Sequence, residues 1–293
     1  MIELLQLARN DVLSAATARK AGVNAGGLAR LVAAGTLHPL VRGWYSVRAP
    51  QDEKDAHWLR ACAAFWRLNS TAMISHQSAL IGYGLPCYQA DLATVHLTKA
   101  RGGTTRMVPQ VKLHRAVKGL KPASDRSPCG AAIVQAGLTC GPLTALVAAD
   151  AALGLKRVTQ EEIDAAVALF ARYAGIGPVR AVLRHVDGAH QSPGETIIAH
   201  RLRGLGWETE PQFRIETDRG DYFADLRVVG HRVLVEFDGK LKYTDPAVNY
   251  AEKQREDAIR RKHWRVVRFG WSELDDLTLI RGRVNQAIAD SRL

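Results

Sequence analysis

The sequence of 293 residues is long enough for two domains or three small ones, and 47% hydrophobic residues is ordinary for a globular protein. It has no apolar run of about 20 residues, and its first twenty residues do not combine a charged segment with an apolar core. We therefore expect neither a membrane span nor a secretory signal, and a cytoplasmic location. The net charge of +11 predicts an anionic partner, with nucleic acid the first candidate.

Four cysteines are scattered along the chain, at Cys62, Cys87, Cys129 and Cys140. They form no C-x-x-C pair, which predicts reduced, mostly buried thiols rather than zinc ligands. The charge is uneven: residues 1–50 carry six Lys/Arg and two Asp/Glu, whereas residues 192–293 carry eighteen and seventeen. A balanced but charge-dense C-terminal third fits a carboxylate site better than a simple basic surface.

Residues 1–50 are predicted to form three helices followed by a β-hairpin. Ser14 is suited to cap the second helix, and Asn24 to cap a third helix that stops near Gly35. The alternating segment "TLHPLVRGWYSVR" predicts two strands joined by a tight turn at Arg42–Gly43. This order of elements is that of a winged helix-turn-helix.

A winged helix places one helix in the major groove of double-stranded DNA and its wing against the backbone. We expect Asn24 to lie at the start of that helix and Arg30, Arg42 and Arg48 to face phosphate. The small residues that follow Asn24 allow close approach to DNA but give little base readout. The alternative is a helix-turn-helix that serves only packing or protein contact.

Residues 51–190 are predicted to be a mixed region of helices and strands. Helices are expected over residues 55–68, 72–86, 141–154 and 159–175. The last begins with a capping box of Thr159 and Glu162, and residues 94–100 and 110–116 are expected to pair as strands. His76, His96 and His114 are interpreted as surface or satisfied core groups, because no two of them have metal-ligand spacing within one helix.

A Gly- and Pro-containing linker around residues 184–195 introduces a third region, residues 191–293. Its expected elements are a helix (194–206), three strands (207–216, 222–229 and 232–238), a helix (246–262), a strand (264–270) and a last helix that starts at Ser272. Short turns join the three strands and predict an antiparallel meander. The whole chain is thus expected to be an α+β multidomain protein with an α/β middle region.

Strand alternation groups the acidic residues of this region. Glu236 and Asp238 share one face of their strand, and a hairpin through Gly230 brings Asp225 of the preceding strand beside Glu236. Two adjacent carboxylates repel each other unless a cation lies between them, and Mg²⁺ accepts one or two carboxylates together with water and phosphate oxygens. Lys240 and Lys242 are candidates to stabilise charge on a phosphodiester.

Each of these residues also has a structural interpretation. Ser192 and Glu195 form a Ser-x-x-Glu pattern that capping alone explains. Asp225 and Glu236 can pair with Arg227, Arg232 or Lys240 in cross-strand salt bridges, and Lys240 and Lys242 can simply solvate a loop. Both interpretations stay open at the level of sequence.

The C-terminal third resembles a known fold family at these positions. Glu195 on a helix, "AD" at Ala224–Asp225 and "EFD" at Glu236–Asp238, with lysines after it, are similar to the PD-(D/E)XK restriction-endonuclease-like fold in its α-β-β-β-α-β order. "SPGE", "EKQRED" and "WRVVRF" are similar to the branch related to very-short-patch repair (Vsr) endonucleases.

The resemblance implies a metal-dependent DNA endonuclease that uses Mg²⁺ or Mn²⁺. Asp225 and Glu236 would be the metal ligands and Glu195 a supporting acid. The family's lysine normally lies two residues after the second acid, where this chain has Asp238. Lys240 or Lys242 would then supply the cation; without it the domain would bind DNA and not cut it.

The first forty-eight residues, with "SHQSALIGYGL" and "GPLTALVAAD", resemble the AbiEi-type antitoxin domain of type IV toxin–antitoxin systems. This resemblance implies a winged-helix transcriptional repressor with a cognate toxin as a further partner. The two hypotheses are therefore a DNA-binding protein with a Vsr-like nuclease domain, and an antitoxin-like repressor whose nuclease fold is inactive.

Overall fold

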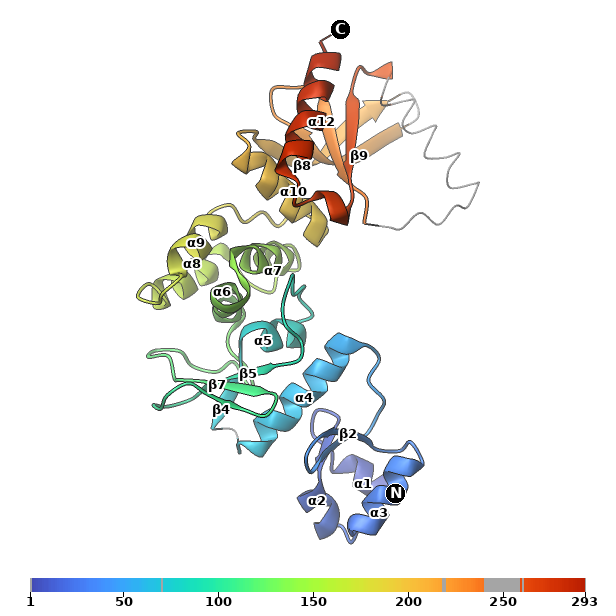
Figure 1. The fold of residues 1–293 in the computed structure, drawn as a ribbon, viewed down its shortest axis with the longest axis vertical. Coiled ribbons are helices and arrows are strands. Elements are labelled where there is room, and N and C mark those ends of the chain that lie inside the picture. Colours follow the sequence, from blue (N-terminus) through green and yellow to red (C-terminus); the bar gives the residue numbers. More distant parts are fainter. Residues whose placement is uncertain (1, 70, 218–219, 240–258, 260, 293) are drawn as a thin grey trace. The chain divides into compact units, whose positions relative to one another are not determined.

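The computed structural model of the chain describes residues 2–69, 71–217, 220–239, 259 and 261–292 (Figure 1). It is a mixed α/β structure in two compact units, one of residues 1–152 and 156–185, the other of residues 153–155 and 186–293. The boundary after His185 falls in the predicted linker segment, whereas residues 1–50 share a unit with the region that follows them. No helix in the described ranges has both the length and the apolar character to cross a membrane.

The first unit begins with a three-helix, three-stranded region. Its elements are α1 (Ile2–Gln6), β1 (Val12–Ser14), α2 (Ala15–Lys20), α3 (Ala25–Ala33), β2 (His38–Val41) and β3 (Trp44–Ser46). The strands form an antiparallel sheet in the order β1-β3-β2. Both predicted caps are confirmed: Ser14 Oγ accepts from Thr17 N at 3.0 Å, and Asn24 Oδ1 from Gly27 N at 2.9 Å.

The predicted hairpin is also confirmed, because Gly43 has a φ of 77° in the turn between β2 and β3. β1 was not predicted; it pairs with β3 along the whole of its length. A small core holds this region together and consists of Leu4, Leu13, Ala18, Leu28 and Leu37. Its buried side chains come from helices and strands alike, so the outer face of α3 is left at the surface.

The rest of the first unit contains a second sheet and several helices. The elements are α4 (Glu53–Arg67), β4 (Ala72–Ile74), α5 (His76–Gly82), β5 (Val95–Lys99), β6 (Arg106–Val108), β7 (Val111–His114), α6 (Cys129–Cys140), α7 (Pro142–Gly154), α8 (Gln160–Leu169) and α9 (Ile176–Leu183). The capping box of Thr159 and Glu162 at the start of α8 is confirmed. The helices α6 and α9 were not predicted.

The helix predicted over residues 72–86 is wrong in its first part. Residues 72–74 form β4, which pairs with β5, and Ile74 also bonds to the chain at Asp125 and Ser127. A short segment that is buried on all sides and has hydrogen-bonding partners on both edges is more stable as a strand. The helix α5 starts only at His76, whose φ is 56°.

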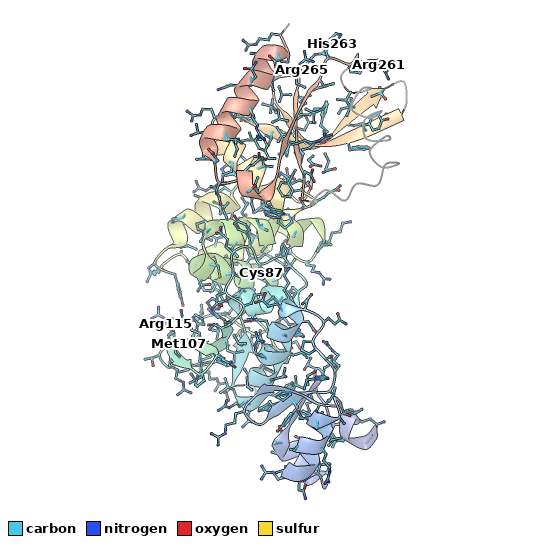
Figure 2. The ribbon with its side chains drawn as sticks, turned by 45° about the vertical axis from the view of Figure 1, so that its right-hand side comes forward. Cys87, Met107, Arg115, Arg261, His263 and Arg265 are labelled. Atoms are coloured by element: carbon cyan, nitrogen blue, oxygen red, sulfur yellow. The ribbon has the colours of Figure 1, made fainter. Side chains whose placement is uncertain are left out.

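The second sheet has the order β4-β5-β7-β6. The predicted strands β5 and β7 do pair, and they run parallel because the segment between them carries β6, which returns antiparallel to β7. β6 is the last strand on its side, and Met107 and Val108 on it are 60% and 38% exposed. Figure 2 shows Met107 at this outer edge of the sheet.

In the part that the structure describes, the second unit packs two helices against a four-stranded sheet. Its elements are α10 (Pro193–Gly204), β8 (Thr209–Thr217), β9 (Gly220–Val228), β10 (Val233–Phe237), β11 (Arg265–Phe269) and α12 (Leu277–Asp290). The strand order is β11-β10-β9-β8; the predicted antiparallel meander of β8, β9 and β10 is confirmed, and β11 runs parallel to β10. Arg265 begins β11, and Arg261 and His263 lie in the segment just before it (Figure 2).

Two further predictions concern the helices of this unit. The helix predicted over residues 246–262 lies outside the described residues, except for 259 and 261–262. The last helix does not start at Ser272: residues 271–273 form a short 3-10 turn, and α12 starts after Asp276, whose Oδ1 accepts from Leu279 N at 2.9 Å. The Asp276 carboxylate thus satisfies an amide of the first turn that has no partner within the helix, as an N-cap does.

Close packing fixes α10 against the end of β10. A Cβ added to Gly194 would lie less than 3.0 Å from three carbon atoms of the Phe237 ring. On its other side this ring meets Trp271 edge-on, with centroids 4.8 Å apart. Glycine at 194 therefore allows the first turn of α10 to touch the strand residue that follows Glu236.

Candidate functional site

The sheet register of the second unit brings the predicted acidic residues together. β9 pairs with β8 through Pro211–Leu226 and Phe213–Ala224, and with β10 through Val235–Leu226. These pairs place Asp225 opposite Gln212 on one side and opposite Glu236 on the other. β10 and β11 then pair Glu236 with Arg268, so the polar row Gln212, Asp225, Glu236 and Arg268 crosses the sheet.

The sheet is kinked at this row. Asp225 is absent from the regular pairing on both sides of β9, and Gln212 has a φ of 51°. The alternation of side chains along β9 is also interrupted here: Arg227 lies opposite Leu234, yet Ala224, three residues earlier, packs in the same buried cluster as Leu234. Irregular backbone of this kind is common next to functional sites and redirects a side chain.

Both central carboxylates have protein partners. Asp225 Oδ2 accepts a hydrogen bond from Phe237 N at 2.7 Å, and Glu236 Oε2 lies 3.2 Å from Arg268 Nε. The Glu236 side chain is 13% exposed, so its charge is largely shielded from water and depends on the guanidinium. An ion pair of the kind that the sequence suggested for Glu236 thus exists with Arg268.

Glu195 takes part in capping α10 and also binds a residue of the sheet. Ser192 Oγ accepts from Glu195 N at 3.2 Å, as the capping interpretation requires. The Glu195 carboxylate accepts from Gln191 N at 2.8 Å and from Gln212 Nε2 at 3.2 Å. Glu195 is 6% exposed, and through Gln212 it is joined to one end of the polar row.

The remaining predicted residues of this site lie beyond the end of β10. Asp238 is exposed, and its backbone N donates to Phe269 O at 2.9 Å. It stands at the position where the nuclease family has lysine. Lys240 and Lys242 lie outside the described residues. Among the described residues, Arg268 is a cation in contact with Glu236.

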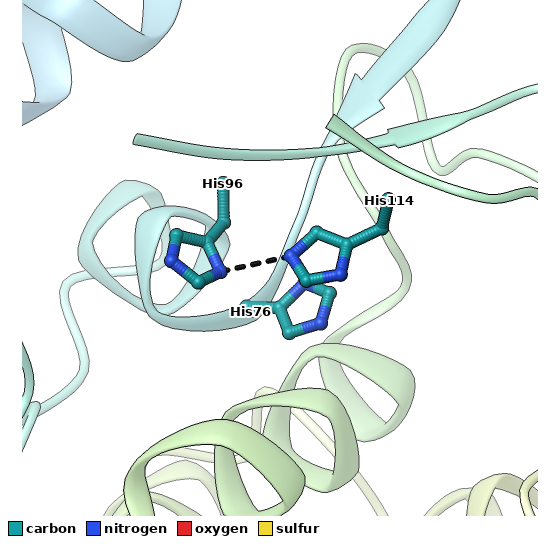
Figure 3. Close-up of side chains that lie close together, drawn as sticks. All are labelled: His76, His96 and His114. Atoms are coloured by element: carbon teal, nitrogen blue, oxygen red, sulfur yellow. Dashed lines mark hydrogen bonds between the residues drawn. The ribbon is translucent and has the colours of Figure 1, made fainter. Parts of the chain in front are cut away.

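A different set of residues comes together in the first unit. Within the described ranges, the one group of three His, Cys, Asp or Glu side chains close enough to share an ion is His76, His96 and His114, whose ligand atoms all lie within 4.8 Å of one another. Glu195, Asp225 and Glu236 do not form such a group. Figure 3 shows the three rings, which come from α5, β5 and β7.

The sequence did not reveal this histidine cluster, because its members are separated by 18 or more residues in the chain. The parallel pairing of β5 and β7 brings His96 and His114 together, and α5 contributes His76. Burial lowers the pKa of His76 well below 6.5, that of His96 to about 3 and that of His114 to about 4. The three rings are therefore neutral at physiological pH.

The residues predicted to contact DNA lie on α3 and the β2–β3 hairpin. Arg30 and Arg42 are exposed, while the Asn24 side chain caps α3. No acidic residue occurs from Val12 to Gln51, so this face has no carboxylate of its own. Arg48 differs: its guanidinium lies 2.8 Å from Asp11 and 2.5 Å from Asp55, which neutralise it and fix this region to the start of α4.

No protein-family model matches this sequence. A comparison with curated proteins likewise finds no relative.

Proposed function

We propose that this chain is a double-stranded DNA-binding protein whose second unit is a metal-dependent, Vsr-like endonuclease domain of the restriction-endonuclease-like fold. The observation that carries the proposal is the register that sets Asp225 beside Glu236 at the kink of the sheet. The order of helix, three antiparallel strands and a further strand parallel to the third supports the same assignment.

The ligand set fits Mg²⁺ or Mn²⁺ in its simplest form. Mg²⁺ requires only one or two carboxylates and keeps its other positions for water and phosphate oxygens. Asp225 and Glu236 would hold the ion, which supplies an activated water and neutralises charge on the phosphodiester. Arg268 lies 3.2 Å from Glu236 and is placed to carry the positive charge that Asp238 does not provide.

The first unit would supply the affinity for DNA. We propose that residues 1–48 act as a winged helix, with α3 at the major groove and the β2–β3 hairpin as its wing. The exposed Arg30 and Arg42 on an acid-free face support this orientation, because most nonspecific affinity comes from lysine and arginine at phosphates. Arg48 is not included, since Asp11 and Asp55 bind it.

The test of catalysis is DNA cleavage in Mg²⁺ or Mn²⁺ by the wild type and by Asp225→Asn. Asparagine keeps an oxygen for Phe237 N and removes the charge, so the sheet should survive. Loss of metal stabilisation should reduce the rate at least about 100-fold. Asp221→Asn is the matched control, because Asp221 lies on the same strand and pairs with Arg214 instead. Equal cleavage by wild type and Asp225→Asn would identify a contaminating nuclease and end the enzyme hypothesis.

The test of DNA contact is the salt dependence of binding. Arg30→Ala and Arg42→Ala should each weaken binding to any duplex and reduce the slope of log K against log[salt] by about 0.9. Arg172→Ala, a change at an exposed arginine elsewhere in the same unit, should leave the slope unchanged. Identical slopes for all three variants would contradict the winged-helix orientation.

A second function is favoured by the partners of the acidic residues. Glu236 is paired with Arg268, Asp225 binds Phe237 N, and Glu195 binds Gln191 and Gln212. A site so completely engaged also fits an AbiEi-like antitoxin, a repressor whose nuclease fold only binds DNA or a cognate toxin. Tight binding to one operator without any divalent metal, together with no cleavage and no Mg²⁺ binding by calorimetry, would decide for this alternative.

A further inference from the structure

The three histidines of the first unit form a built cluster whose members are held by different elements. His114 Nε2 lies 3.0 Å from His96 Nδ1, and the rings of His76 and His114 stack with centroids 3.8 Å apart (Figure 3). His76 and His96 are each 6% exposed. Ring nitrogens that are buried in this way need hydrogen-bond partners from the protein or a bound group.

Two of the three histidines are held in place by hydrogen bonds to neighbouring residues. The His76 Nδ1 atom lies 2.9 Å from Ser75 Oγ, which accepts from Thr98 Oγ1 at 2.8 Å, and Thr98 Oγ1 accepts in turn from Gln135 Nε2 at 3.2 Å. The backbone N of His96 donates to Ser78 Oγ at 2.8 Å. The contact at His76 Nδ1 is of the type that orients a metal-binding histidine and leaves its other ring nitrogen available.

The backbone also carries a sign of function. His76 begins α5 with a φ of 56°, a conformation that costs energy for any residue except glycine. This conformation turns the His76 ring toward the β5–β7 face, where it stacks on His114. With Nδ1 engaged by Ser75, Nε2 is the ligand atom that His76 offers.

We propose that His76, His96 and His114 bind a divalent transition-metal ion of the Zn²⁺ class. Three imidazoles and no carboxylate suit Zn²⁺, Co²⁺, Ni²⁺ or Cu²⁺ and not Mg²⁺ or Ca²⁺, which require oxygen. With Zn–N bonds of about 2.0–2.1 Å, tetrahedral ligand atoms lie about 3.4 Å apart. The cluster, with one pair at 3.0 Å and all atoms within 4.8 Å, reaches this geometry by small ring movements.

The site would tie three elements of the first unit together and is independent of the proposed nuclease site. The hydrogen bond between His114 and His96 would be replaced by two bonds to the ion. Lys112 lies opposite His96 in the register. Its positive charge would repel a bound cation, and the three metal–nitrogen bonds have to outweigh this repulsion.

The test uses the full chain without a polyhistidine tag, stripped of metal by a chelator and titrated with Zn²⁺ by calorimetry. We expect one Zn²⁺ per chain with a dissociation constant of about 1 µM or lower, and a rise in melting temperature on binding. With Co²⁺, the same site should give the intense visible absorption of tetrahedral coordination, and Zn²⁺ should abolish it.

Variants assign the site. His96→Gln and His114→Gln should each weaken Zn²⁺ binding at least about 100-fold; His114 is the less buried, and its variant is the safer to fold. His76→Asn keeps a residue that accepts a positive φ and should also lose affinity. His231→Gln, which removes a histidine of the second unit, should bind Zn²⁺ like the wild type. Absence of binding below about 100 µM in the folded wild type, or unchanged binding in His96→Gln and His114→Gln, would overturn the proposal.

Discussion

The contact between Gly194 and Phe237 predicts that a glycine-to-alanine substitution has opposite effects on stability at the two ends of α10, at Gly194 and at Gly204. In Gly194→Ala, the new methyl group would lie less than 3.0 Å from three ring carbons of Phe237, and Trp271 limits the movement of that ring. Overpacking of this kind costs about 1–3 kcal/mol. Gly204 ends the same helix with no atom within 4 Å of an added Cβ, so Gly204→Ala should stabilise by about 0.5–1 kcal/mol.

Alanine favours the helix at both positions, so the difference between the variants isolates the clash. We expect Gly194→Ala to be less stable than Gly204→Ala by about 1–3 kcal/mol. Urea-induced unfolding, followed by tryptophan fluorescence and by circular dichroism, measures this difference. If Gly194→Ala were as stable as Gly204→Ala, the packing of α10 against Phe237 would be wrong, and with it the position of Glu195 relative to β10.

Three further predictions concern the first unit. Arg48→Ala should destabilise it by about 1–2 kcal/mol in urea unfolding, because it leaves Asp11 and Asp55 without their shared guanidinium; an unchanged midpoint would contradict this. The Arg48 side chain holds the pKa of Asp55 below its ordinary 3.8. The contribution of this ion pair to the free energy of unfolding is therefore complete above pH 3.8 and is lost as the pH falls through the pKa of Asp55 in the folded protein. When the pH is lowered from about 5 to about 3, Asp55→Asn should lose less stability than the wild type. Burial raises the pKa of the Cys62 and Cys87 thiols to about 12. At about pH 8, a disulfide reagent should therefore modify both thiols about a thousandfold more slowly in native than in denatured protein. Fast labelling of Cys62 in the native protein would contradict the buried position of α4.

The features that could be predicted from the sequence are those whose partners lie close together in the chain. Ser14, Asn24 and Thr159 each cap an amide three residues ahead, so the residue type and its position contain the whole interaction. The placement of Asp225 beside Glu236 followed from one short hairpin. The start of α12 was wrong by five residues because two chemically similar caps, Ser272 and Asp276, compete within a few positions.

The features that could not be predicted depend on distant segments. The sequence pattern of residues 72–74 predicts helix, whereas the partners that make them a strand, β5 and the chain at Asp125, lie far along the sequence. The histidine cluster depends on the parallel pairing of β5 and β7, which residue spacing within a helix cannot reveal. Likewise, the sequence predicts that Arg48 faces DNA phosphate, whereas in the folded protein Arg48 forms an ion pair with Asp55. Non-local pairing decides which polar groups meet.

The short outer strand β6 has a practical consequence for handling the protein. β6 is an edge strand of the second sheet, and its Met107 and Val108 side chains are apolar and exposed. A strand of another molecule can therefore pair with it. Such edges promote self-association in concentrated solution, and a lysine on the strand is a common safeguard. Met107→Lys would place a further positive charge beside Arg106 and opposite Lys112, and should reduce such self-association at the concentrations that calorimetry requires.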